Sequence, residues 1–443
     1  MKLQTVKDFS RKNIIYLPFL LSAAFLLSMI LRFGINTPFW DQWSMVPLLQ
    51  KMDNHTLTFF NLWHQYNEHR ILFPLTVLML NAYLTHWNIL SELLINFCTA
   101  FVTAIILAFL IKRTFNKLFI SVIAAVLAAL WFFSTIQWEN WLWGWQLEWF
   151  MCVLGTISSL FFLILQNTNN DDKNKKVYFL LAILSGIVAS YSLSSGVVAW
   201  IVGFFVLIAV KQSKKYKLVW AITGALTIAF YYYHYSIPIH SDNLTLTFFS
   251  HHILRFVGFF LAYLSGPIGY GTQNVTTAIL AGGALLACFP ALIIFVWKDR
   301  EHLRKYIPWL SIAMLSLLSG LTITIGRLFL GIPEALASRY TTLSVLYIIS
   351  ITILSLIVLE DRQAARRKAI YIASVLIISM FLILSSYKMG DIGLIERSIA
   401  LQNVKTCTNK SNPSNSCLEL TYPIPNVVRP ELRFLKENHL AGY

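Results

Sequence analysis

The chain has 443 residues, of which 57% are hydrophobic and only 12% are charged, and its formal net charge is +15 at pH 7. This composition excludes an ordinary soluble domain and is typical of a polytopic membrane protein, as is the mean hydropathy of +0.63. The basic surplus lies in short segments between apolar stretches, so it indicates membrane topology and gives no support for nucleic-acid binding.

Apolar stretches that reach or approach the length of a membrane-spanning helix, about 20 residues, recur along the chain. The sequence therefore predicts an all-α polytopic integral membrane protein with about 11 transmembrane helices, in a range of about 9 to 13. The first stretch is too long for a cleaved signal peptide and lacks a small-residue cleavage site, so we expect it to remain as an anchor. The expected spans are 14–34, 88–111, 118–136, 150–166, 177–194, 196–210, 218–235, 275–297, 306–325, 340–359 and 369–387.

Basic clusters precede the first span and lie in every second connection after it. The positive-inside rule places all of them in the cytoplasm, which puts the amino terminus inside and the carboxyl tail outside. In a Gram-negative host the membrane would be the inner membrane and the tail would be periplasmic. The clusters are Lys2, Lys7, Arg11 and Lys12; Lys112, Arg113 and Lys117; Lys173, Lys175 and Lys176; Lys211, Lys214, Lys215 and Lys217; Lys298, Arg300, Arg304 and Lys305; Arg362, Arg366, Arg367 and Lys368.

Two further apolar stretches, 71–87 and 248–265, have the length of a helix but would move a basic cluster outside if either crossed once. We expect both to be interfacial or re-entrant helices on the external face. The alternative is that each crosses the membrane and a neighbouring span is misassigned. We divide the chain into a transmembrane domain, 1–387, whose first external loop covers 35–87, and an external carboxyl-terminal tail, 388–443.

The first external loop carries an acid between two tryptophans, in the run Trp40-Asp41-Gln42-Trp43. A carboxylate in this setting has its pKa shifted by desolvation or by a nearby cation, and either state suits a general base or acid. The alternative is an interfacial aromatic belt in which Asp41 only caps the following helix. A second polar cluster, at the end of the loop, favours the catalytic interpretation; its members are Asn67, Glu68, His69 and Arg70.

A turn at 137–149 contains five tryptophans, two glutamates and an asparagine. Tryptophan faces stack on sugar rings, and glutamate and asparagine can hydrogen-bond sugar hydroxyls, although an aromatic belt at the headgroup level would look similar. Two acids in so apolar a turn favour a binding role. The predicted sugar-binding residues are Trp40, Trp43, Asn67, Glu139, Trp143, Gln146 and Glu148.

The connection before the span at 340–359 contains Arg327 and Arg339, which flank an apolar turn. Two external arginines are candidate phosphate ligands, and we add His69 and Arg70 to this set. The alternative is a structural ion pair between arginine and Glu334.

The external tail contains Cys407 and Cys417. An oxidising compartment would allow them to form a disulfide, the alternative being two free thiols. No other potential ligands stand near them at metal spacing, so a zinc site is not expected.

These clusters share one side of the membrane although they come from distant parts of the chain. An outward-facing pocket of this kind suits a polyprenyl-phosphate sugar, with the lipid among the spans, the phosphate against arginine or histidine, and the sugar on tryptophan. A carboxylate would accept the proton of the attacking hydroxyl in a direct displacement with inversion.

In this arrangement the chain resembles the polytopic lipid-linked glycosyltransferases of the GT-C fold and, more loosely, the serotype-converting enzymes of bacteria and phages that glucosylate O-antigen. The likeness lies in the long first external loop with an acid just after the first span, the interfacial helices and the external tail. It implies that Asp41 is the catalytic base, with Glu68 as the next candidate, and that the donor is an undecaprenyl-phosphate sugar used in the periplasm. Many members have paired acids in this loop where Asp41 stands alone, so we predict no metal and no other cofactor.

Two other functions remain open at this stage. One is a transporter or flippase for lipid-linked oligosaccharides, although such proteins usually carry repeats and charges at mid-membrane. The other is an O-antigen polymerase, which would lengthen chains where a glucosyltransferase would decorate them.

Overall fold

The computed structural model describes residues 13–169, 171–236, 252–268, 274–298, 302–360 and 365–443. Within these ranges the chain forms helices and turns, and its only pairing of the β type is an isolated bridge between Tyr66 and His69. Eight helices are long and apolar enough to cross a membrane. The prediction of an all-α polytopic membrane protein is confirmed.

Each predicted span is a helix in the structure. Three of these helices are not clear spans: one has only 12 residues, and the other two, with 19 residues each, begin within basic clusters. For these three, α10 to α12, a crossing stays a prediction. The helices are α2 (Tyr16–Phe33), α6 (Ile89–Thr114), α7 (Leu118–Phe132), α9 (Leu147–Thr168), α10 (Asp172–Ser190), α11 (Val198–Ala209), α12 (Lys214–Tyr232), α16 (Val275–Lys298), α17 (Leu303–Arg327), α18 (Thr341–Glu360) and α19 (Ala365–Thr408).

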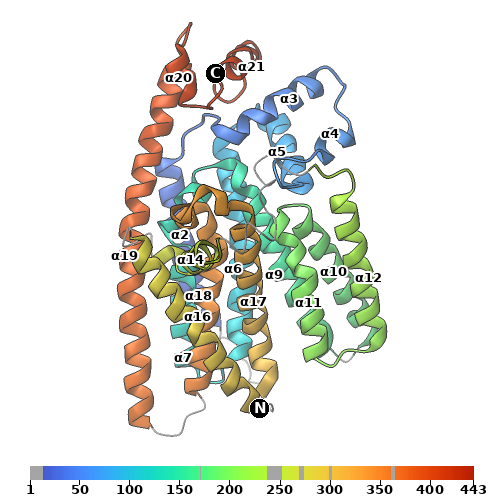
Figure 1. Ribbon diagram of the computed structural model, residues 1–443, viewed down its shortest axis with the longest axis vertical. Helices are drawn as coiled ribbons and strands as arrows, with labels where there is room; N and C mark the ends of the chain where they lie inside the picture. The colour runs from blue at the N-terminus through green and yellow to red at the C-terminus, as the bar shows by residue number, and fades with distance from the viewer. Residues whose placement is uncertain (1–12, 170, 237–251, 269–273, 299–301, 361–364) are drawn as a thin grey trace.

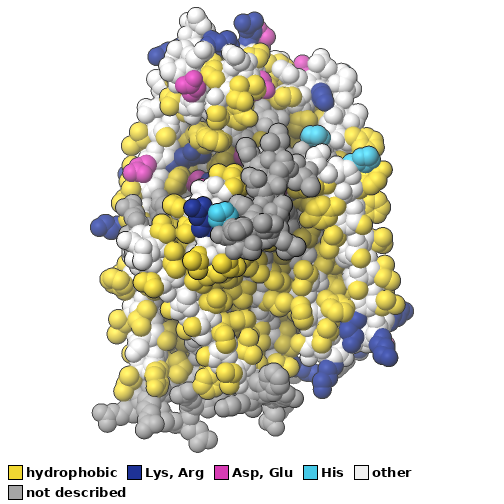
Figure 2. Space-filling view, viewed as in Figure 1, with side chains coloured by type: hydrophobic (Ala, Val, Ile, Leu, Met, Phe, Trp, Pro, Cys, Tyr) yellow, Lys and Arg dark blue, Asp and Glu magenta, His cyan; other side chains and the backbone are white. Residues whose placement is uncertain are grey.

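The apolar side chains of the bundle divide between its interior and its sides. Helix α18 is apolar all round and lies at the centre, with 83% of its span buried, whereas α16 and α19 lie at the periphery with only 17% buried. Exposed apolar side chains cover much of the face of the bundle that Figure 2 shows. A helix that is hydrophobic all round needs either protein or lipid around it, and here the two cases occur in one bundle.

The first described residues, just before α2, and the carboxyl terminus lie at opposite ends of the bundle (Figure 1). The connections after α6, α9 and α11, which carry basic clusters, lie at the same end as the first described residues. The helices of the first external loop lie at the other end, together with the carboxyl terminus. This segregation agrees with the predicted topology, and which end faces the cytoplasm stays a prediction.

The two stretches expected to be interfacial are short helices, α5 (Leu72–Thr85) and α14 (Ile253–Leu264), and residues 248–251 lie outside the described ranges. With 14 and 12 residues they extend about 21 and 18 Å, less than the roughly 30 Å of a hydrocarbon core. Their lengths favour the interfacial or re-entrant interpretation over a crossing.

The expected end of the last span at 387 is not a helix end. Helix α19 has 44 residues, about 66 Å, and runs through the division at 387 as far as Thr408. The tail then folds into α20 (Asn415–Glu419) and α21 (Pro425–Glu437), above the loop helices α3 (Val46–Asp53) and α4 (Phe59–Trp63). Cys407 and Cys417 form the expected disulfide, with Cα atoms 5.8 Å apart. The tail is thus a cap that packs on the first loop.

Candidate functional site

A cavity of about 500 Å³ lies between the first loop, the Trp-rich turn, the α17–α18 connection and α19. It brings together most of the residues that the sequence singles out, although they are up to about three hundred positions apart. From the predicted set, its lining includes Trp40, Asp41, Asn67, His69, Glu139, Trp143, Gln146, Glu148, Arg327 and Arg339.

Asp41 lies in a short 3-10 helix, η2 (Trp40–Met45), and the neighbouring residue Gln42 is bound by Glu92 at the start of α6. Glu92 is fully buried and accepts hydrogen bonds from the Gln42 amide at 2.6 Å and the Trp87 indole at 2.8 Å. A methyl group at Gly144 would overlap the same carboxylate, so the Trp-rich turn closes directly on this anchor. Glu92 therefore fixes the loop that carries the acid.

The carboxylate of Asp41 accepts a hydrogen bond from the Tyr66 hydroxyl at 3.2 Å, and that hydroxyl is also 2.7 Å from Ser44 Oγ. Burial raises the pKa of Asp41 above its ordinary value, and the Tyr66 hydrogen bond and the positive charges of Arg339 and Arg327 offset part of this rise. A carboxylate with a raised pKa is a better proton acceptor than an exposed one.

The polar cluster at the end of the first loop forms a tight turn. Tyr66 and His69 exchange two backbone hydrogen bonds of 2.8 Å, and Asn67 between them has a φ of 48°, which asparagine tolerates better than most residues. The turn points Asn67 and His69 into the cavity. Glu68 is outside the lining and forms an ion pair with Arg327.

Glu68 and His69 have lowered pKa values for different reasons. Burial acts to raise the pKa of Glu68, but His69 and Arg327 outweigh it, so the carboxyl stays ionised. Burial lowers the pKa of His69, Arg327 adds to this effect, and Glu68 at 3.5 Å opposes it. The lowered pKa favours the neutral imidazole, whose Nδ1 accepts a hydrogen bond from the Ser194 N–H at 3.4 Å and whose Nε2 faces Glu68.

The Trp-rich turn consists of η3 (Thr135–Gln137), α8 (Trp138–Trp141) and η4 (Gly144–Gln146). The Trp143 indole donates to the carbonyl of Phe39 at 3.1 Å, which joins this turn to the first loop. Gln146 Oε1 and Trp149 Nε1 are buried in the lining and have no hydrogen-bond partner among the described residues. The turn and the start of α9 thus leave an acceptor and a donor unpaired beside the aromatic faces of the cavity.

Arg339 realises the ion pair that the sequence left as the alternative to phosphate binding. Its guanidinium contacts Glu334 and lies 3.2 Å from Glu139, and its backbone N–H donates to Glu139 at 2.9 Å. Arg327 is likewise paired, with Glu68. Both arginines line the cavity, but carboxylates of the protein already neutralise them.

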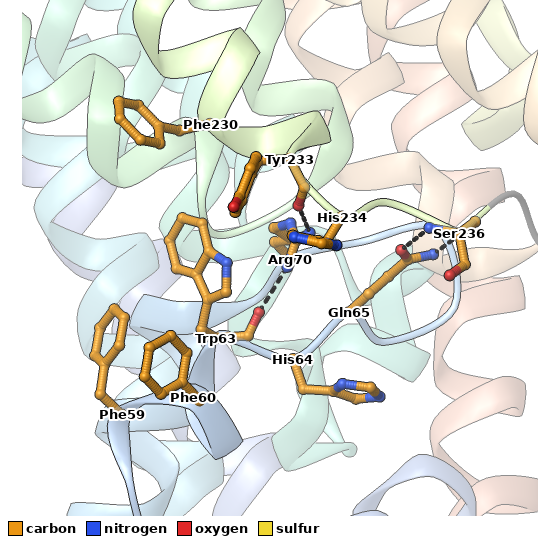
Figure 3. Close-up of a pocket in the computed structure, with 10 residues that line it drawn as sticks. All are labelled: Phe59, Phe60, Trp63, His64, Gln65, Arg70, Phe230, Tyr233, His234 and Ser236. Carbon is orange, nitrogen blue, oxygen red and sulfur yellow. Dashed lines mark hydrogen bonds between the residues drawn. The ribbon is translucent and has the colours of Figure 1, made fainter.

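Three predicted residues do not line the cavity: Glu68, described above, Trp43 and Arg70. Trp43 is 1% exposed and packs in the core under the cap, so a sugar cannot reach it. Arg70 donates to the carbonyls of Trp63 and Tyr233 at 2.8 and 2.6 Å (Figure 3). It also donates to the carbonyl of Tyr231 at 2.6 Å, and its guanidinium lies over the Trp63 ring. Arg70 joins the first loop to the end of α12, and we withdraw both predicted binding roles.

Arg397 on α19 lines the cavity although the sequence did not single it out. Gly390 and Gly393 allow this approach, because a Cβ at either would overlap the 135–138 segment. The Cζ atom of Arg397 lies 3.7 Å from the centre of the Phe39 ring and 5.6 Å from the centre of the Trp143 ring. The spacing of Gly390 and Gly393 could have indicated a close contact of this segment with another part of the chain. The polar residues after 387, however, led to the prediction that the helix ends there.

Comparison of the sequence with protein-family models and with curated proteins, and of the fold with solved structures, finds no match. The chemistry of the cavity must therefore be judged from its own groups. They comprise a desolvated carboxylate, several tryptophan faces, unpaired amide and indole groups, and three arginines. Such a lining can hold a ring with many hydroxyls beside an anion, and it can accept a proton.

Proposed function

We propose that this chain is a membrane glycosyltransferase. It transfers a sugar, a hexose such as glucose, from a polyprenyl-phosphate donor to a surface polysaccharide or lipid-linked acceptor at the periplasmic face of the bacterial inner membrane. The observation that carries the proposal is the cavity in which Asp41, held by Tyr66, faces tryptophans and arginines within a membrane protein. A proton acceptor, sugar-stacking faces and cations are the three elements that this reaction requires.

Asp41 is the general base in this reaction. Its carboxylate takes the proton of the acceptor hydroxyl as the hydroxyl oxygen forms a bond to the anomeric carbon of the sugar. The bond from that carbon to the phosphate oxygen breaks, and the electron pair leaves with the polyprenyl phosphate. The anomeric configuration is inverted, and Asp41 then loses its proton to solvent. Because phosphate is already a stabilised leaving group, the reaction needs no strong general acid.

The sugar and its neighbours are positioned by the Trp-rich turn and the first loop. Trp143 and Trp40 offer ring faces, while Gln146, Glu148 and Asn67 offer hydrogen-bonding groups to the hydroxyls. Glu139 is engaged with Arg339, so its role is to fix the α17–α18 connection against the Trp-rich turn.

A second, larger cavity of about 730 Å³ supports the lipid-linked nature of the donor (Figure 3). Aromatic rings of α4 and the end of α12 line it, among them Phe60, which is 78% exposed, and Phe230. The turn at 66–69 separates it from the catalytic cavity, with His64 and Gln65 on one side and Tyr66 and Asn67 on the other. An isoprenoid chain would bury these rings beside the sugar.

The experiment that tests this proposal compares surface polysaccharide from cells that express the wild type or Asp41→Asn, by mass spectrometry. We expect a hexose-sized mass increment per repeat with the wild type only, at equal amounts of membrane-inserted protein. An unchanged repeat mass with altered chain length would favour a polymerase, and accumulated lipid-linked precursor would favour a flippase; either result would refute the glycosyltransferase.

A further inference from the structure

The catalytic cavity has three arginines, and two of them are neutralised by the protein itself. Arg327 is paired with Glu68, and Arg339 is paired with two carboxylates. Within the part of the chain that the structure describes, no carboxylate contacts the guanidinium of Arg397. Among the described residues, Arg397 is therefore the cavity arginine that no contacting carboxylate pairs.

The free groups of Arg397 form a ready-made anion-binding edge. Its Nε and Nη2 atoms are buried and have no hydrogen-bond partner among the described residues, although the side chain lines the cavity. These two nitrogens lie on the same edge of the planar guanidinium, which is the edge that binds two oxygens of a carboxylate or phosphate in parallel. The Phe39 ring covers the guanidinium at 3.7 Å, so stacking holds its plane while leaving that edge unpaired.

An unpaired buried charge is unfavourable unless a ligand completes it. Aromatic rings attract a cation, but they carry no net charge and cannot satisfy its N–H groups. The residues that hold Arg397 in place are themselves tied to the catalytic loop, because the Trp143 indole donates to the Phe39 carbonyl. An anion bound by Arg397 is thus placed within the same cavity as Asp41.

We propose that Arg397 binds the phosphoryl group of the ligand, with Nε and Nη2 each donating to one oxygen. This inference rests on the proposed function for the identity of the ligand, a prenyl-linked phosphate. It assigns to α19 the role that the sequence gave to Arg327 and Arg339, which instead hold the walls of the cavity. A free phosphate has the same chemistry, and the test below separates the two sources.

The test measures the affinity of the purified full-length protein in detergent for undecaprenyl phosphate, for undecaprenol and for inorganic phosphate. The variants are Arg397→Met, which keeps the length of the side chain without its charge, and Arg397→Lys, which keeps the charge without the fork. Arg429→Gln is the matched control, because Arg429 lies in the cap and bonds Asn412 and Asn415 there. Melting temperatures are measured with and without each ligand.

We expect Arg397→Met to weaken undecaprenyl phosphate binding at least tenfold, Arg397→Lys to weaken it less, and Arg429→Gln to leave it unchanged. Without ligand, Arg397→Met should melt at or above the wild-type temperature, because among the described residues Nε and Nη2 have no hydrogen-bond partner to lose and methionine can still pack on the Phe39 ring. A structural role would instead lower that temperature. Undecaprenol, which lacks the phosphate, should bind weakly and equally to all variants.

Equal affinity of the wild type and Arg397→Met for undecaprenyl phosphate would overturn this inference while leaving the proposed function standing. If only inorganic phosphate binds, and requires Arg397, the anion site stands and the lipid-linked donor fails. If neither phosphate compound binds the wild type, the inference is refuted. Should Arg397→Met fail to fold, Arg397→Lys decides the question by the same comparison.

Discussion

Removal of one hydroxyl should move the pH dependence of the reaction in a defined direction. The Tyr66 hydroxyl donates to the Asp41 carboxylate at 3.2 Å, and this bond stabilises the ionised form of the acid. In Tyr66→Phe the bond is lost, so the pKa of Asp41, already raised by burial, rises further. Because only the ionised carboxylate accepts a proton, the acid limb of the pH–rate profile must shift to higher pH.

The size of the shift follows from the strength of the bond. A hydrogen bond to a charged group contributes about 1.5–3 kcal/mol, and one of 3.2 Å lies at the weak end of that range. One pKa unit corresponds to about 1.4 kcal/mol, so we expect an upward shift of about one pH unit. At a pH below the pKa of Asp41 in both proteins, the variant should then be about tenfold slower than the wild type.

The assay is kcat/KM for sugar transfer over a range of pH, with the wild type, Tyr66→Phe and Tyr387→Phe. Tyr387 is the matched control, because its hydroxyl donates to the Leu130 carbonyl at 3.0 Å and lies outside the catalytic cavity. An unmoved limb in Tyr66→Phe, or a shift to lower pH, would refute the assignment of Asp41 as the base that Tyr66 adjusts.

Three further predictions concern the elements around the cavity. Arg70→Met should lower the free energy of unfolding by about 3 kcal/mol, since three carbonyls in one buried and two part-buried hydrogen bonds lose a charged donor; unchanged thermal unfolding in detergent would contradict the structural role. Replacement of Cys407 and Cys417 by serine opens a loop with a sequence separation of 10 and should cost about 3 kcal/mol, and a melting temperature insensitive to reductant would show that no such constraint exists. Phe60→Asp, at a side chain 78% exposed, should raise KM for a long-chain donor more than for a short-chain one. Equal changes in the two KM values would exclude the second, larger cavity as the lipid site.

The spans and the meeting of distant residues could be predicted from the sequence for a simple physical reason. Hydropathy and basic clusters determine which connections share an end of the bundle. Loops at the same end of a compact bundle lie close together and contact one another. Asp41, Glu148 and Arg327 therefore line one cavity, as expected of groups at the same end of the bundle.

The pairing of the charges could not be predicted, because it depends on tertiary distances. Arg339 stands five residues after Glu334, so the ion pair was a stated alternative, but its second partner Glu139 is 200 residues away. The orientation of Trp43 into the core depends on a short 3-10 helix that Glu92 anchors. No hydrophobic periodicity in the loop predicts this helix. Arg397 was missed because α19 continues through a polar stretch.

The most direct test of the account uses purified protein in liposomes, an undecaprenyl-phosphate hexose, and acceptor polysaccharide from cells that lack this chain. The quantity measured is the undecaprenyl phosphate released together with sugar incorporated into the acceptor. We predict equal amounts of both for the wild type, and neither for Asp41→Asn, at an unchanged melting temperature. Full activity of folded Asp41→Asn would contradict the central claim that the Asp41 carboxylate is the base of a membrane glycosyltransferase.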